Sequence, residues 1–139
     1  MSGDDIMKKD NKFKIIINIT IMVSVAIVML SGKVSYTLEG DTLVVGSFLS
    51  GKSKVEVQDI EKLELRNDFE LGKRSFGISN LRISGGTFTN DEFGKYKLYK
   101  CNNVDKILIV HTEEGVIAFN LQTEEKTEAV YQELQGKLE

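Results

Sequence analysis

Short apolar segments alternate with turn-forming residues through most of this chain, and this pattern constrains the fold more than any other feature. In the segments VSYTL, TLVVGSF, KVEV, EKLELR and KYKLYK, apolar side chains recur at every second position. Tight-turn sequences such as EGD, NDEFG and EEG separate such segments. A period of two is typical of strands with one buried face, and turns about every eight to twelve residues are typical of antiparallel sandwiches and barrels. The chain from residue 33 onward is therefore expected to be mainly β.

The end of the chain changes this pattern. The segment KILIVHT, residues 106–112, is apolar on both faces and predicts a central strand. Thr123 is a suitable N-cap, and two glutamates follow it in what would be the first turn of a helix. The apolar stripe of that helix, at spacings of three and four, is Thr127, Val130, Tyr131, Leu134 and Leu138. We expect this helix to cover one open end or face of the β structure.

The glycine-rich stretch from Glu70 to Tyr99 raises the question of a phosphate-binding loop. Such a loop needs a strand, then glycines, then a helix whose N-terminus faces the phosphate. Here the glycines are followed by TFTNDEFGKYKLY, which continues the β alternation. The glycines are therefore interpreted as turn and bulge positions in a twisted sheet.

The N-terminal third has a different composition. The run Ile15–Leu30 contains no charged residue, and four lysines precede it at positions 8, 9, 12 and 14. This pattern predicts a single transmembrane helix over residues 15–32, retained as a signal anchor, with the N-terminus in the cytoplasm. Residues 1–14 form a short polar, lysine-rich segment, and residues 33–139 form one domain. A signal peptide cleaved after Ser24-Val25-Ala26 is the alternative. A buried core helix is not expected, because the run is apolar on all faces except at Asn18, Thr20 and Ser24.

Composition restricts the function. The chain has 139 residues, enough for one ordinary domain, and carries 18 basic against 21 acidic residues. A nucleic-acid-binding domain normally has a basic surface, so we expect no nucleic-acid partner. The single cysteine, Cys101, allows no internal disulfide.

Few residues suggest catalysis or metal binding. His111 is the only histidine and lies near the end of a strand, where packing or hydrogen bonding is the expected role. Cys101 has no second cysteine beside it, and the acids Asp91 and Glu92 lie together in a turn. We therefore expect no catalytic residue, metal site or cofactor. Basic residues from the glycine-rich stretch onward, expected to contact anionic lipid or a partner, are Lys73, Arg74, Arg82, Lys95, Lys97 and Lys100, with ordinary solvated faces as the alternative.

Several segments, taken in order, resemble the bacterial pleckstrin-homology-like (PH-like) domains often found beside transmembrane segments. They are YTLEGDTLVV, VQDIEKLEL, GKRSFG, RISGGTF, GKYKLY and ILIVHTEEGVIAFNLQTEEKTEAVYQEL, and they extend from about Ser35 to Leu138. The resemblance implies a seven-stranded, strongly bent antiparallel β-barrel, closed at one end by the C-terminal helix. Relatives that bind phosphoinositides use basic residues around the first strand turn, whereas EGD is acidic here, so inositol phosphate binding is not expected.

The resemblance and the apolar run together predict a non-enzymatic, membrane-anchored PH-like module for protein interaction or assembly at the cell membrane. Its partners would be the bilayer, through residues 15–32, and a protein, with a second copy of the chain as a further candidate. The domain would lie on the outer side of the membrane. The preferred contact region is an exposed strand edge between the GGTF and GKYKLY segments. The alternative function is a small-ligand or anionic lipid-headgroup binding domain.

Overall fold

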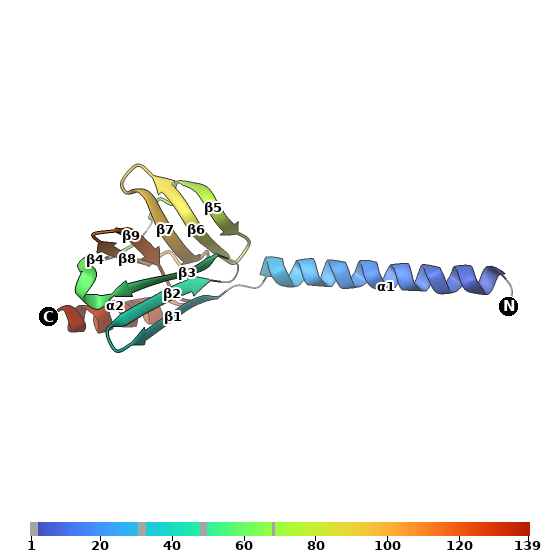
Figure 1. Ribbon diagram of the computed structural model, residues 1–139, viewed down its shortest axis with the longest axis horizontal. Coiled ribbons are helices and arrows are strands. Elements are labelled where there is room, and N and C mark those ends of the chain that lie inside the picture. The colour runs from blue at the N-terminus through green and yellow to red at the C-terminus, as the bar shows by residue number, and fades with distance from the viewer. Residues whose placement is uncertain (1–2, 31–32, 48–49, 68) are drawn as a thin grey trace. The chain divides into compact units, whose positions relative to one another are not determined.

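A computed structural model describes residues 3–30, 33–47, 50–67 and 69–139. The chain divides into two compact units, Met1–Ser31 and Gly32–Glu139. The first contains the helix α1 (Gly3–Leu30), and the second contains all the strands and the helix α2 (Glu124–Leu138) (Figure 1).

Helix α1 confirms the predicted helix over Ile15–Leu30 and extends it to Gly3 at its N-terminal end. The hydroxyl of Thr20 donates to the carbonyl of Ile16, and the hydroxyl of Ser24 donates to the carbonyl of Thr20, each over 2.8 Å. The apolar side chains described between Phe13 and Val25 are exposed.

The predicted transmembrane helix over residues 15–32 is not supported. Among the helices of the described residues, none combines the length and the apolar character that a membrane crossing requires. The uncharged run of ~16 residues corresponds to ~24 Å of helix, which is shorter than a hydrocarbon core of ~30 Å. Ser31 and Gly32, at the end of the predicted span, lie outside the described residues.

The second unit is built from two sheets. The smaller one has the order β1-β2-β3 and is antiparallel. The larger one has the order β4-β8-β9-β7-β6-β5. The strands of the smaller sheet are β1 (Val34–Glu39), β2 (Thr42–Ser47) and β3 (Gly51–Glu56). Those of the larger sheet are β4 (Ile60–Arg66), β5 (Lys73–Ser79), β6 (Ile83–Asn90), β7 (Gly94–Cys101), β8 (Ile107–Thr112) and β9 (Gly115–Phe119).

The expected seven-stranded closed antiparallel barrel is wrong in three respects. The described residues form nine strands, the two sheets do not join into a closed barrel, and β7 pairs with β9 in parallel. The short 3-10 helix η1 (Val57–Asp59) redirects the chain after β3, so that β4 pairs with β8 instead of extending the smaller sheet. Within the part of the chain that the structure describes, the outer side of β3 is therefore left without a partner strand.

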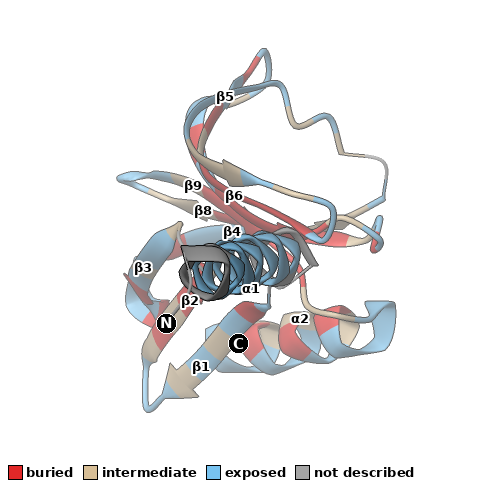
Figure 2. Ribbon diagram, turned by 90° about the vertical axis from the view of Figure 1, so that its right-hand side faces the viewer, coloured by how far each residue is buried: buried red, intermediate tan, exposed pale blue. Residues whose placement is uncertain are grey.

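One hydrophobic core lies between the smaller sheet, one face of the larger sheet and α2. Leu43 and Val45 contribute to it from β2, Tyr99 from β7 and Phe119 from β9. From α2, Val130 and Leu134 join the same cluster, which confirms the predicted docking of this helix. Figure 2 shows buried residues on both sheets and along one side of α2.

A second core covers the opposite face of the larger sheet. It contains Tyr96 and Leu98 from β7 and Ile107 and Ile109 from β8, and Phe69 from the β4–β5 connection packs against it. The predicted central position of residues 106–112 is confirmed, because β8 lies between β4 and β9 and is buried on both faces.

The predicted end signals of α2 are confirmed. The side chain of Thr123 accepts a hydrogen bond from the amide of Lys126, and Glu124 and Glu125 lie in the first turn. Thr127 is buried with Val130 and Leu134, whereas Tyr131 is half-buried and Leu138 is 38% exposed. The stripe predicted from the sequence is therefore in contact with the core at its centre and exposed at its C-terminal end.

The glycine-rich stretch forms the β5–β6–β7 meander, as predicted, and no helix follows it. Gly77 on β5 and Gly86 on β6 are paired across the strands, and both have a φ of +125°. A Cβ at Gly77 would collide with the backbone oxygen of Gly85. A register shift between Arg74 and Phe76 marks a bulge, although the residue at it is Ser75 and not one of the glycines.

Candidate functional site: a cleft between the two sheets

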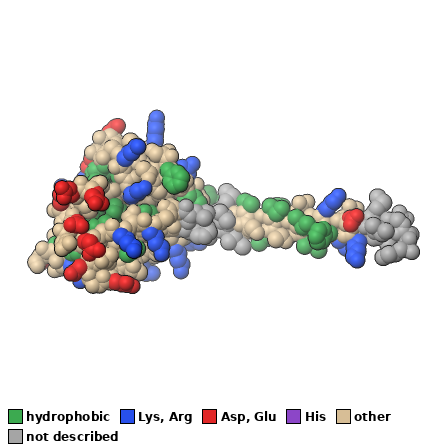
Figure 3. All heavy atoms as spheres, in the orientation of Figure 1, with side chains coloured by type: hydrophobic (Ala, Val, Ile, Leu, Met, Phe, Trp, Pro, Cys, Tyr) green, Lys and Arg blue, Asp and Glu red, His purple; other side chains and the backbone are tan. Residues whose placement is uncertain are grey.

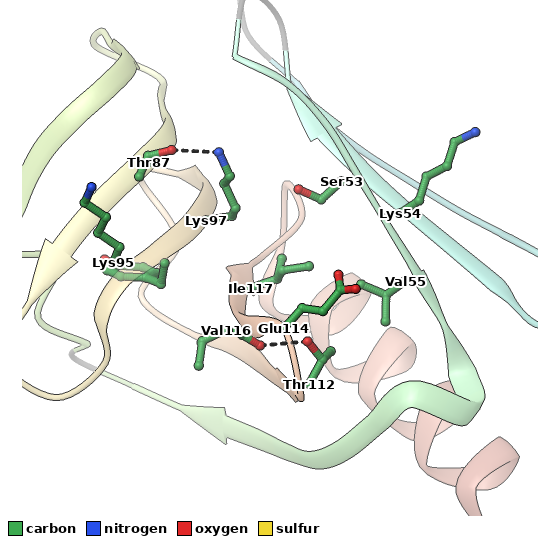
Figure 4. A pocket seen from close by; sticks show the side chains of 12 residues that line it. Ser53, Lys54, Val55, Thr87, Lys95, Lys97, Thr112, Glu114, Val116 and Ile117 are labelled. Carbon is green, nitrogen blue, oxygen red and sulfur yellow. Dashed lines mark hydrogen bonds between the residues drawn. The ribbon is translucent and has the colours of Figure 1, made fainter.

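A cleft of about 440 Å³ opens where the two sheets fail to join. Its walls come from β3 on one side, from β6 and β7 on the other, and from the β8–β9 hairpin at one end (Figure 4). The lining residues are Ser53, Lys54, Val55, Thr87, Lys95, Tyr96, Lys97, Thr112, Glu114, Gly115, Val116 and Ile117.

The cleft continues the first hydrophobic core outward. Val55 and Ile117 belong to that core and also line the cleft. Beside them, the Oγ of Ser53 on β3 lies 2.6 Å from the Oη of Tyr99 on β7. This hydrogen bond links two strands that share no backbone ladder, so it closes the interior at the base of the cleft.

One wall of the cleft is basic. The Nζ of Lys97 donates to the Oγ1 of Thr87 over 2.7 Å, and Lys95 lies two residues earlier on the same face of β7. Strand register places Lys73, Thr89 and Lys95 in one row across β5, β6 and β7, and Phe76, Thr87 and Lys97 in another row. Residues directly opposite each other point to the same face of a sheet, so this basic wall extends from the cleft across the face of the meander.

The other end of the cleft is acidic. A second hollow, of about 320 Å³, shares Lys54, Val55, Thr112 and Glu114 with the first. Its acidic lining residues are Glu56, Asp59, Glu61, Glu113 and Glu114. Figure 3 shows acidic side chains gathered at one end of this unit, with lysines beside them. The two hollows therefore form one groove along β3 with a basic end and an acidic end.

The structure separates the basic residues that the sequence suggested. Lys95 and Lys97 line the cleft, and Lys73 extends the same face onto β5. Arg74 lies opposite Phe88, which belongs to the second core, so it is directed to the other face. Arg82 lies in the β5–β6 turn.

Lys100 differs from the other basic candidates because it is buried, with Nζ 3.4 Å from the carbonyl oxygens of Cys101 and Asn102. Burial lowers the pKa of this lysine. It is therefore part of the interior and not of a contact surface.

The exposed strand edge predicted between the GGTF and GKYKLY segments is not present. The GGTF and GKYKLY segments do not expose an edge between them, because β6 and β7 pair from Ile83 opposite Cys101 to Asn90 opposite Gly94. Among the described residues, the edge strands are β1 and β3 in the smaller sheet and β4 and β5 in the larger one. The strands could be predicted from the sequence, but the order in which they pair within each sheet could not.

Three further residues line the cleft but were not predicted as site residues, namely Ser53, Lys54 and Glu114. All three lie in segments that were recognised as a strand or a turn. Their place beside the cleft depends on the pairing order of strands that are distant in the sequence. The alternation of SKVEV, which places Ser53 and Val55 on one face, was the available signal.

His111 and Glu92, which were considered for chemistry from the sequence, form side-chain hydrogen bonds within the domain. The Nε2 of His111 lies 2.6 Å from an oxygen of Glu64, as the predicted hydrogen-bonding role requires, and its ring packs edge-on against Phe93. Arg66 bonds to Glu64 and also to Glu92 of the β6–β7 turn. Burial alone would raise the pKa of Glu64, but hydrogen bonds from Arg66 and His111 outweigh it and lower the pKa to about 2.

Cys101 is buried at the end of β7, and burial raises the pKa of its thiol. A protonated, inaccessible thiol is a poor nucleophile. Among the described residues, no group of three histidine, cysteine or acidic side chains is arranged to hold a metal ion.

Comparison with protein families gives one finding. Residues 34–138 match the family model described as a bacterial PH domain. The match extends from the first strand to the last turn of α2, and it includes every residue that lines the cleft. No curated protein and no solved structure matches the chain significantly.

Proposed function

The chain belongs to the bacterial PH domain family, and we propose from this premise that it is a non-enzymatic module that binds a protein partner through the cleft between its two sheets. The observation that carries this proposal is the open cleft itself. It combines a free strand edge, a partly apolar floor and charged groups of both signs. These are the elements from which peptide-binding sites are commonly built.

The state of the reactive side chains supports a role in binding over one in catalysis. His111 is held by Glu64, and Glu64 is also held by Arg66. The thiol of Cys101 is buried away from the cleft lining. None of these three groups is arranged as an exposed nucleophile with an adjacent general base.

Helix α1 supports a location at a membrane. From Phe13 to Val25, its described isoleucines, valines, phenylalanine and Met22 are between 42% and 71% exposed. The hydroxyls of Thr20 and Ser24 bond to backbone carbonyls within the helix, which lowers the cost of placing them in lipid. We propose that this stretch attaches the chain to a membrane, and that the PH domain lies on the outer side of that membrane.

A photocrosslinking amino acid at position 95 tests the proposed partner site. Lys95 is exposed and lines the cleft, whereas Gln132 is exposed on α2 and serves as the matched control. In cells of the source organism, we expect a discrete protein adduct from position 95 and none from position 132. Introducing Lys97→Glu should weaken the adduct. Adducts of equal yield at both positions, or none at either, would contradict the proposal.

The membrane location is tested with a thiol-reactive reagent that does not cross membranes. Because Cys101 is buried, it gives a low background, and Asn103→Cys provides an exposed thiol in the β7–β8 turn. We expect Asn103→Cys to be labelled in intact cells and to remain in the membrane fraction after washing with high salt. Labelling in permeabilised cells alone would place the domain on the cytoplasmic side. Release of the protein from the membrane fraction by high salt would contradict the proposed attachment through the apolar residues of α1.

The basic end of the cleft favours a second candidate, the binding of a small anion or an anionic lipid headgroup. Lys97 and Lys95 lie beside the hydroxyls of Thr87 and Ser53, and this combination is suited to phosphate oxygens. Vesicles of a zwitterionic lipid with and without an added anionic lipid provide the test. Binding that requires the anionic lipid and is lost in Lys95→Gln/Lys97→Gln would favour this second function over a protein partner.

A further inference from the structure

No strand of the described residues pairs with the outer edge of β3. β3 pairs with β2 from Gly51 to Glu56, and the order of the smaller sheet ends there. The 440 Å³ cleft and the 320 Å³ hollow both adjoin this strand and share Lys54 and Val55. The edge is thus bordered by open space and not by another part of the domain.

The hairpin geometry indicates which backbone groups of β3 are unpaired. A two-residue loop, Gly40 and Asp41, joins β1 to β2, so Glu39 and Thr42 form a hydrogen-bonded pair. Hydrogen-bonded and non-hydrogen-bonded pairs alternate along an antiparallel ladder, so Leu43 and Val45 of β2 bond to β3 and not to β1. Their partners on β3 are Val55 and Ser53, whose amides are therefore directed at β2. The amides and carbonyls of Lys52 and Lys54 are then directed at the free side.

The side chains of β3 alternate across this edge. Ser53 and Val55 are on the cleft side, whereas Lys54 points away from it (Figure 4). A strand added to β3 would alternate in the same way. Its residues opposite Ser53 and Val55 would point into the cleft toward Lys97 and Ile117. Its residues opposite Lys52 and Lys54 would lie on the outer face.

The charges on both faces favour an acidic occupant. Lys52 and Lys54 are exposed on the outer face of β3, and Lys95 and Lys97 are on the cleft wall. Opposite charges across neighbouring strands are stabilising, and like charges are destabilising. A second copy of β3 paired antiparallel about Lys54 would set Lys54 against Lys54 and Lys52 against Glu56, so self-pairing gains less from charge than an acidic strand does.

We propose that an extended, acidic segment of the partner adds to β3 as a fourth strand of the smaller sheet. Its acidic side chains lie beside Lys52 and Lys54 on the outer face, and its apolar side chains alternate into the cleft above Val55 and Ile117. This inference rests on the proposed protein-binding function and specifies the chemistry of its partner. Glu113 and Glu114, at the other end of the groove, disfavour acidic side chains that point into the cleft there.

The probe for this proposal is a labelled ten-residue peptide in which glutamate alternates with valine and threonine. A matched peptide carries lysine in place of each glutamate. Both are titrated into the full chain in a neutral detergent, with binding followed by fluorescence anisotropy. We expect saturable binding of the glutamate peptide and at least tenfold weaker binding of the lysine peptide. Equal binding of the two peptides, or no binding of either, would overturn the proposal.

Hydrogen exchange distinguishes strand addition from simple charge attraction in the unmodified chain. Upon addition of the glutamate peptide, the amides of Lys52 and Lys54 should become protected. The amides of Ser53 and Val55, already bonded to β2, should change little. Protection that does not alternate in this way, or that is confined to β5, would reject β3 as the docking edge.

Two substitutions at one position separate the backbone from the charge. Lys54→Pro removes the amide on the free side, where an edge strand tolerates proline, and should abolish the peptide-induced protection. Lys54→Gln removes the same charge but keeps the amide, and should weaken binding only about two- to fivefold. Circular dichroism checks that both variants are folded. Equal losses in the two variants would mean that no backbone ladder forms.

The crosslinking and peptide-binding experiments together distinguish failure of strand addition from failure of the proposed protein-binding function. If the crosslink from position 95 to a protein persists while the glutamate peptide does not bind, the cleft is a protein site but strand addition is wrong. If the crosslink is also absent, the protein-binding function itself is rejected. A dimer of the chain that is lost in Lys54→Pro would assign the edge to a second copy and overturn the acidic partner.

Discussion

The hydroxyl of Tyr99 on β7 lies 2.6 Å from the hydroxyl of Ser53 on β3. The two strands belong to different sheets, so this side-chain contact joins parts of the domain that no backbone ladder connects. Above it the sheets diverge into the cleft, and below it the first core is closed. The position of the free edge of β3 relative to the basic wall therefore depends on this pair.

Tyr99→Phe tests the role of this contact. The change removes the hydroxyl and keeps the buried ring, so the expected loss of unfolding free energy is about 0.5–1.5 kcal/mol. Hydrogen exchange along β3 should also become faster. Tyr36→Phe is the matched control, because its hydroxyl lies 3.4 Å from Glu133 at the exposed surface. A Tyr99→Phe variant as stable as this control would show that the contact contributes nothing.

Leu134→Ala tests the docking of α2. Leu134 is fully buried in the first core, so its truncation leaves a cavity and should lower the unfolding free energy by about 2–5 kcal/mol. Leu138→Ala, on the same stripe but exposed, should cost less than about 0.5 kcal/mol. Chemical denaturation of both variants measures the difference. Similar small losses would mean that α2 is not packed on the sheets in solution.

The Glu64–His111 contact predicts a dependence of stability on pH. The folded-state pKa of Glu64 is lowered from 4.5 to about 2. A lowered pKa stabilises the fold fully above the unfolded value, and this contribution is lost as the pH falls through the folded value. The midpoint of thermal unfolding should therefore decrease between about pH 4.5 and pH 2, and Glu64→Gln should remove part of that decrease.

The control for this titration is Glu61→Gln, which removes an exposed carboxylate from the same strand. Its profile should follow that of the unmodified chain. If Glu64→Gln also follows it, the hydrogen bonds from Arg66 and His111 do not stabilise the folded state.

Gly77→Ala tests the conformation of the β5–β6 hairpin. Gly77 has a φ of +125°, and an added Cβ would collide with the backbone oxygen of Gly85. We expect a loss of at least about 1–3 kcal/mol in unfolding free energy. Gly136→Ala provides the contrast, because no atom lies within 4 Å of its added Cβ in α2, and it should stabilise the chain by up to about 1 kcal/mol. A neutral Gly77→Ala would mean that the hairpin adopts another conformation.

Local patterns were sufficient to predict most of the secondary structure. The EGD and NDEFG turns, the strands with Tyr96 and Leu98 on one buried face and the Thr123 cap were all recognisable because each depends on neighbours in the sequence. The seven-stranded barrel was taken from the family resemblance, although the chain contains more strand segments than seven. The error arose because barrel closure is a relation between strands and not a property of any one strand.

The candidate site could be predicted only in part. Lys95 and Lys97 were selected for their charge, and both line the cleft. Arg74 and Lys100 were selected for the same reason, yet one is directed to the opposite face and the other is buried. Charge is visible in a sequence, but the face on which it lies also depends on bulges, such as the one between Arg74 and Phe76.

The sequence by itself determined the strands, the turns, the final helix and the membership of residues 34–138 in the family, because these follow from periodicities and caps within short stretches of chain. The tertiary structure alone decided that β4 pairs with β8, that β9 lies parallel to β7, and that β3 keeps a free edge. Each of these pairings brings together residues far apart in the chain, and many pairings satisfy the same alternation of apolar and polar residues. The choice among them is made by packing both cores at once, and the cleft lies where that packing leaves the two sheets unjoined.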